Sequence, residues 1–165
     1  CGLPISLVNA LAESGSVVHF AGHLDLEGRD SLESRLRLAD GDLRLYELFS
    51  KRVRAQLVVL SACESRIAGG DARIGREPTG RELLSLAESV LLSGAKAVLA
   101  TTSRVNDVAA AVLIKRFYRA LKKSAPAVAL REARLVVRKF HPHPAWWANF
   151  SLVVGNPESL GGAGI

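Results

Sequence analysis

The sequence predicts an α/β domain in which a mostly parallel sheet lies between two layers of helices. Short runs such as 57–62 and 97–101 are almost continuously apolar, as in strands that helices cover on both faces. These runs alternate along the chain with longer stretches of helical periodicity. A chain of 165 residues, 48% of them hydrophobic, is long and apolar enough to form one domain with a substantial core.

The first part of the chain predicts a helix followed by a strand. Apolar residues at helical spacing favour a helix over 4–13, and Gly15 is placed to end it. β-Branched and aromatic residues predict a buried strand over 17–21. Residues 22–33 are polar and carry a glycine, so we expect a loop there.

The next elements have weaker signals until the second buried strand. Leu36 and Leu38 alternate with arginines before Asp40-Gly41, which indicates a strand and a turn. A short helix is expected over 45–52, and a strand covered on both faces over 57–62. The glycine-rich, charged segment 65–80 is too long for a simple connection, and loops of this kind are usually functional or disordered.

The second half of the chain has the strongest helix signals. Periodicity and capping residues predict three helices, over 81–93 with Gly94 at its end, 106–123 with Asn106 as its cap, and 126–138. A buried strand is expected over 97–101, and a last strand over 150–154. Residues 158–165 form a glycine-rich tail that we expect to be disordered.

The net charge of +6 arises mainly from arginine. The basic residues are scattered among helices, with short clusters at 51–52, 115–116 and 122–123, so solvated helix faces are the first interpretation. Nucleic-acid binding would rest on charge alone, because aromatic residues for base stacking do not accompany these clusters. No apolar run reaches membrane-spanning length, and two cysteines favour a reducing, cytoplasmic compartment over a disulfide framework.

Two strand ends carry the residues with the most chemistry. His23 follows the strand 17–21, and Cys63 directly follows the strand 57–62. Parallel strands end together at one edge of a sheet, so an imidazole and a thiol are expected side by side there. The imidazole helps the thiol to ionise, and the thiolate can attack a carbonyl. A histidine about forty residues before the cysteine also follows the caspase order, where the separation is roughly 50.

Less specific interpretations stay open for the same residues. A cysteine at a strand end is in general a small buried hydrophobe, although the long loop after Cys63 favours a surface cleft. His19 lies within its strand and is interpreted as a packed, hydrogen-bonded side chain. A zinc site would draw on His19, His23, Cys63, His141 and His143. The spacing of these histidines is poor for ligands on a strand or in a His-Pro-His sequence, so no metal or cofactor is expected.

The sequence resembles the CHAT family, whose caspase-like peptidase domains are related to caspases and separases and are often attached to TPR repeats. The family signature HFAGHG is similar to His19-Phe20-Ala21-Gly22-His23-Leu24, and LVVLSACETG is similar to the segment that begins at Leu57. Shorter matches follow in the same order at 91–98, 105–107, 116–121, 129–133 and 143–150. The resemblance extends from about residue 15 to residue 157.

The resemblance implies a three-layer αβα caspase-hemoglobinase fold and cleavage of a peptide bond. It implies that His23 is the general base and Cys63 the nucleophile, with the backbone amides of Cys63 and Leu24 as the oxyanion hole. The expected substrate-binding residues are Asp25, Glu64, Ser103 and Arg104, whose charges differ in sign.

The family's first strand would lie upstream of residue 1. Residues 1–157 are therefore expected to be the C-terminal major part of a CHAT domain, followed by the tail.

Departures from the family pattern flank the expected substrate cleft. Leu24 stands where the family has glycine, Ser65-Arg66 replaces Thr-Gly, and Thr102-Ser103-Arg104 replaces Leu-Trp-Pro. The first hypothesis is a cysteine endopeptidase that cleaves specific protein partners under the control of other regions or subunits, TPR-containing ones among them. The alternative is a catalytically degenerate domain that serves as a protein-interaction module, which the side chain of Leu24 favours.

Overall fold

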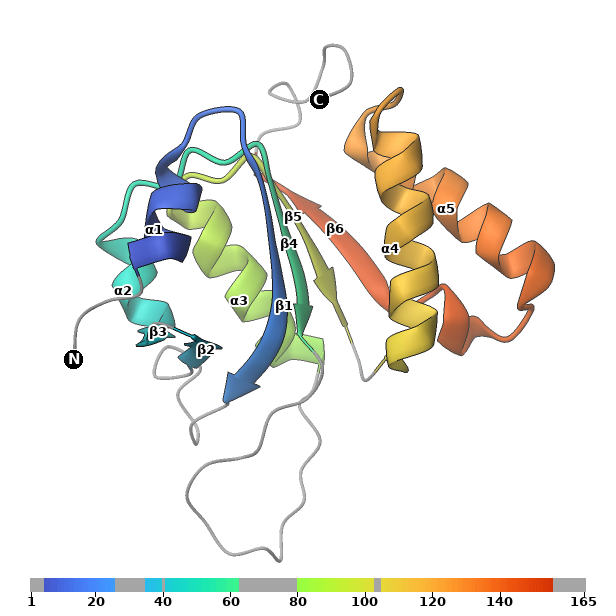
Figure 1. The fold of residues 1–165 in the computed structure, drawn as a ribbon, viewed down its shortest axis with the longest axis horizontal. Helices are drawn as coiled ribbons and strands as arrows, with labels where there is room; N and C mark the ends of the chain where they lie inside the picture. The colour runs from blue at the N-terminus through green and yellow to red at the C-terminus, as the bar shows by residue number, and fades with distance from the viewer. Residues whose placement is uncertain (1–4, 26–34, 40, 63–79, 103–104, 156–165) are drawn as a thin grey trace, which may run out of the picture.

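The computed structural model describes residues 5–25, 35–39, 41–62, 80–102 and 105–155. Six strands form one sheet in the order β3-β2-β1-β4-β5-β6, and helices lie on both of its faces (Figure 1). The strands are β1 (Val17–Asp25), β2 (Arg35–Leu38), β3 (Gly41–Arg44), β4 (Leu57–Ala62), β5 (Ala97–Thr101) and β6 (Phe150–Val154). The helices are α1 (Ile5–Ala12), α2 (Leu45–Phe49), α3 (Gly80–Leu92), α4 (Asp107–Leu121) and α5 (Pro126–Phe140), with a 3₁₀ turn over Pro144–Trp146.

The four strands β1, β4, β5 and β6 form the mostly parallel sheet that the sequence predicts. β4 pairs in parallel with both β1 and β5, and β6 runs antiparallel to β5. The hairpin of β2 and β3 extends the sheet beyond β1 with antiparallel pairs. The α/β fold class with two helical layers is therefore confirmed, and it is compatible with a caspase-like three-layer fold.

The sheet separates two hydrophobic cores. Because side chains alternate along a strand, Val58 and Leu60 of β4 enter the core beneath α1, α2 and α3, whereas Leu57 and Val59 enter the core beneath α4 and α5. All four are buried. Burial on both faces explains why 57–62 and 97–101 are continuous apolar runs rather than alternating ones.

Strand pairing extends the sheet beyond the predicted limits. The predicted loop over 22–33 is wrong at its start, because β1 continues to Asp25 and pairs there with β2 in the register His23↔Arg37. The sequence analysis also missed β3, which is short and polar and is held by its ladder with β2. It missed the turn over Pro144–Trp146 as well. The predicted loop 65–80 and tail 158–165 lie outside the described residues, except that α3 already begins at Gly80.

The helices on the α4 side begin where capping residues predict. The side chain of Asn106 accepts hydrogen bonds from the amides of Val108 at 3.0 Å and Ala109 at 3.3 Å, and Pro126 occupies the first turn of α5. Within the described ranges, no helix is both long and apolar enough to cross a membrane.

The turn after α3 brings two backbone segments into close contact. Gly94 has φ +117°, and a Cβ built on it would lie 2.4 Å from the carbonyl oxygen of Val53. The amide of Val53 donates to the carbonyl of Ser93 at 2.9 Å, so this turn holds the segment that leads into β4. Only glycine satisfies both the positive φ and the short distance.

Gly94→Ala should therefore destabilise the protein more than Gly15→Ala. Gly15 also has a positive φ, of +78°, but a Cβ there meets nothing within 4 Å. We expect Gly15→Ala to lower the free energy of unfolding by about 1–2 kcal/mol through backbone strain. Gly94→Ala should cost about 1–3 kcal/mol more, because the Val53 carbonyl must move. Urea denaturation of both variants tests this, and equal losses would contradict the close contact.

Candidate functional site

The candidate site lies where β1 and β4 end together. Their parallel ladder runs through six consecutive pairs, from Val17↔Leu57 to Gly22↔Ala62. Ala62, the partner of Gly22, is the last residue of β4, and His23 directly follows Gly22 in β1. This is the carboxyl edge of parallel strands, where α/β folds place their sites.

Three of the predicted site residues lie at this edge within β1. His23, Leu24 and Asp25 are its last residues, and they pair with Arg37, Leu36 and Arg35 of β2, respectively. On one edge, β1 pairs with β4 up to Gly22. On its other edge, β1 pairs with β2 from His23 onward. The other predicted residues, Cys63, Glu64, Ser103 and Arg104, lie outside the described residues.

The carboxyl end of β5 lies along the same edge. Thr101 pairs with Phe150, and the amide of Thr102 donates to the carbonyl of Asn149 at 2.8 Å. This bond fixes the backbone just before position 103, so the chain leaves β5 at a defined point beside β6.

A hydrogen bond joins β1 and β4 shortly before their common end. Nε2 of His19 lies 2.9 Å from Oγ of Ser61, and the His19 ring is 5.7 Å, centroid to centroid, from Tyr118 of α4. In the register, His19 lies opposite Val59, and Ser61 lies opposite Ala21. Val59 and Ser61 are two positions apart in β4 and therefore point to the same face of the sheet. His19 shares that face because it is paired with Val59. The contact therefore links both strands at a fixed stagger.

The structure confirms the hydrogen bond predicted for His19 but not its close packing. Its neighbours Val18 and Phe20 are buried in the core beneath α3, whereas His19 itself is exposed on the opposite face. Val17, on that same face, is 37% exposed. The α4 layer therefore covers this part of β1 only in part, which the apolar neighbours of His19 in the sequence do not reveal.

Partial desolvation keeps both titratable groups of this contact neutral near pH 7. It lowers the pKa of His19 from 6.5 by disfavouring the imidazolium, and it raises the pKa of Tyr118 to about 12 by disfavouring the phenolate. A neutral imidazole has one donor and one acceptor nitrogen, and the Ser61 hydroxyl can serve either. The contact is therefore an uncharged link between strands at neutral pH.

Two other histidines have local structural roles at the end of α5. The His141 ring stacks on Trp146 at 3.9 Å with an interplanar angle of 12°, and Nδ1 of His143 accepts from the amide of Ala145 at 3.2 Å. In the part of the chain that the structure describes, no three His, Cys, Asp or Glu residues are grouped as a metal ion would require. The sequence analysis had weighed these histidines only as metal ligands.

The depressed pKa of His19 should make stability depend on pH. The unfolded chain binds a proton at His19 more readily than the folded chain, so protonation favours unfolding as the pH falls through about 6.5. The wild type should therefore lose more unfolding free energy than His19→Gln between about pH 7.5 and pH 5.5. Glutamine can still hydrogen-bond to Ser61 but does not titrate. Denaturation curves at both pH values measure the difference, and parallel losses would count against the desolvated imidazole.

Comparison with known protein families finds a match to the CHAT domain over residues 4–156. The match includes all six strands and all five helices that the structure describes. A comparison with curated proteins finds no match. The matched region contains both sequence signatures and the sheet edge where β1 and β4 end. The chain belongs to the CHAT family of caspase-like peptidase domains.

Proposed function

We propose that this domain is a cysteine endopeptidase in which His23 is the general base and Cys63 the nucleophile. The register of β1 and β4 is the observation that carries the proposal, because Gly22 lies opposite Ala62 and the next residues are His23 and Cys63. Adjacent strands lie about 4.8 Å apart, and bonded neighbours have Cα atoms 3.8 Å apart. We therefore propose that Cys63 lies within reach of His23 at this edge of the sheet.

In the proposed reaction, the His23 imidazole takes the thiol proton of Cys63, and the thiolate attacks the carbonyl carbon of the scissile peptide bond. The backbone amides of Cys63 and Leu24 would donate hydrogen bonds to the oxyanion that forms. His23 then gives its proton to the leaving amine, which departs and leaves an acyl-enzyme. Water, activated by His23, hydrolyses this thioester and restores the thiol.

The proposed substrate is a specific protein partner, and the proposed regulators are other regions or subunits, TPR-containing ones among them. Asp25 ends β1 two residues after His23, and Glu64 directly follows Cys63 in the sequence, so both would lie beside the dyad. Glu64, Ser103 and Arg104 follow β4 and β5 in the sequence, so they would line the same edge of the sheet. This set contains both signs of charge and does not by itself select an acidic or a basic cleavage site.

A protein-interaction module is the second candidate, and Leu24 is the observation that favours it. Leu24 is paired with Leu36 of β2 near the end of β1, at a position where the family has glycine. Unlike glycine, leucine carries a Cβ that restricts the backbone angles, and we propose that its side chain would crowd the space that substrate needs. If this crowding excludes substrate, the domain keeps the fold and its surfaces but not turnover.

His23→Ala and Cys63→Ala should each abolish nearly all peptide cleavage, and the double variant should be no worse than either. Residues that act as one unit show this non-additivity, and loss of the base alone should cost about 10²–10⁴-fold in turnover. Cys1→Ala is the matched control, because Cys1 is the other of the two cysteines and should be dispensable. Hydrolysis of a fluorogenic peptide library and labelling by a thiol probe measure both effects.

Normal cleavage by Cys63→Ala would exclude the proposed nucleophile. Failure of the wild type to cleave any peptide, together with cleavage by Leu24→Gly, would show that Leu24 blocks the site. That result would favour the interaction module.

A further inference from the structure

The positive charge of the protein is concentrated in the α4–α5 layer. Residues 107–140 hold nine Lys and Arg but two Asp and Glu, a net charge of +7, whereas the rest of the chain has 13 basic and 14 acidic residues, a net charge of −1. Eight of the nine basic side chains are exposed: Lys115, Arg116, Arg119, Lys122, Lys123, Arg131, Arg138 and Lys139. The segment that forms α4 and α5 therefore carries the whole positive excess.

The outer face of α5 combines this charge with exposed apolar side chains. Four of the eight large exposed apolar residues in the described chain belong to α5, among them Val128 at 46% and Leu135 at 50% exposure. The opposite face of α5 is buried against α4 and the sheet through Ala129, Leu130, Ala133 and Val137. The exposed residues are therefore not needed for the core.

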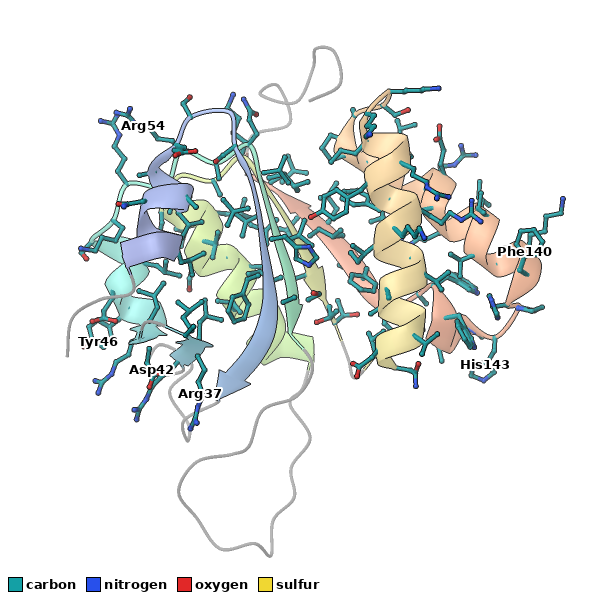
Figure 2. All side chains as sticks on the ribbon, viewed as in Figure 1. Arg37, Asp42, Tyr46, Arg54, Phe140 and His143 are labelled. Atoms are coloured by element: carbon teal, nitrogen blue, oxygen red, sulfur yellow. The ribbon has the colours of Figure 1, made fainter. Side chains whose placement is uncertain are left out.

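The spacing of these residues makes them one stripe along the helix. The α5 stripe consists of Val128, Arg131, Leu135, Arg138 and Lys139; the first four recur at intervals of three or four residues, and Lys139 lies four residues after Leu135. Residues at these intervals lie on the same side of a helix. Phe140 is 67% exposed where α5 ends, on the side of the molecule opposite Arg54 (Figure 2), but its spacing from Ala133 and Val137 places it outside the stripe.

We propose that the α5 stripe is a docking surface for an acidic, amphipathic segment of a partner protein. Val128 and Leu135 are two helical turns apart, so they fit apolar side chains at the same spacing on the partner. The flanking arginines and lysine complement Asp or Glu on either side of those anchors, and the charge of α4 accelerates the encounter. This proposal does not depend on peptidase activity.

A protein segment fits these observations better than a membrane or a nucleic acid. Cations and apolar residues alternate along the stripe and do not form the separate apolar side that an interfacial helix inserts into lipid. A single-stranded nucleic acid would use aromatic stacking platforms. The two tryptophans near this end of α5 already stack with other side chains, Trp146 with His141 and Trp147 with Arg138, whose guanidinium lies 5.5 Å from the ring centroid.

The test uses a fluorescent helical peptide of Leu and Glu, about 15 residues long like α5, and a scrambled peptide of the same composition. Arg131→Glu combined with Arg138→Glu should weaken binding of the amphipathic peptide at least about tenfold. Leu135→Ser should weaken it about fivefold through loss of the apolar anchor. The control, Arg52→Glu combined with Arg54→Glu, makes the same charge change at exposed sites away from α5 and should change the Kd less than about twofold.

Circular dichroism of the full chain verifies that each variant is folded before its Kd is compared. Equal weakening by the control pair, or equal binding of the scrambled peptide, would overturn the proposal. It would also be overturned if the amphipathic peptide failed to bind while phosphatidylserine vesicles or single-stranded DNA bound and were lost in the α5 pair. That outcome would assign the stripe to a membrane or a nucleic acid.

Discussion

The parallel register between β1 and β4 is the constraint on which the candidate site depends. A shift of one residue would move Val18 and Phe20 from the core to the exposed face, because side chains alternate along a strand. Full burial of a residue such as Phe contributes about 1.5–3 kcal/mol, so the cores strongly favour one register. The same register makes Gly22 and Ala62 neighbours at the end of the ladder, and His23 directly follows Gly22.

Contacts at both ends of the ladder hold this register. Before β4, the amides of Val53, Arg54 and Gln56 donate to carbonyls of Ser93, Leu11 and Ser16, respectively. These bonds tie the entry of β4 to the ends of α1 and α3 and to the residue before β1. Near the other end, the contact of His19 with Ser61 joins the two strands on the α4 face. The ladder is therefore fixed where it begins and just before the candidate site.

Burial determines how much of this fold the sequence predicts. The strands 57–62 and 97–101 and the helix that Asn106 caps are predicted at their observed positions, because two-sided burial and capping have local signals. Two features depend on pairing with β2: the extension of β1 to Asp25 and the strand β3. The local sequence pattern does not predict that pairing. A hydrogen bond of His19 was predicted, but its partner Ser61 was not, because the two residues are far apart in the sequence. The placement of His23 at the sheet edge was predicted, whereas the roles of Cys63 and of the substrate-binding residues remain predictions.

The charge distribution was also predicted only in part from the sequence. Short basic clusters can be recognised along the sequence, where each is interpreted as the solvated face of a single helix. The sequence does not show which helices pack side by side. The packing of α4 against α5 gathers the positive charge into one layer and leaves Val128 and Leu135 exposed within it. A surface of this kind depends on which helix faces the core takes, and it can serve partner recognition whether or not the sheet edge is catalytic.

Disulfide formation between positions 23 and 63 tests the register and the candidate site together, without requiring substrate or an activating signal. In a Cys1→Ala background, His23→Cys supplies a second thiol opposite the natural Cys63. A disulfide needs Cα atoms about 4.4–6.8 Å apart, so residues that continue the Gly22↔Ala62 pair should link readily under mild oxidation. Asp42→Cys in the same background, on β3 at the far end of the sheet, is the control. The account predicts an intramolecular disulfide, detected by peptide mass, in the first variant and none in the second. No disulfide with His23→Cys, or equal linkage in both variants, would contradict it.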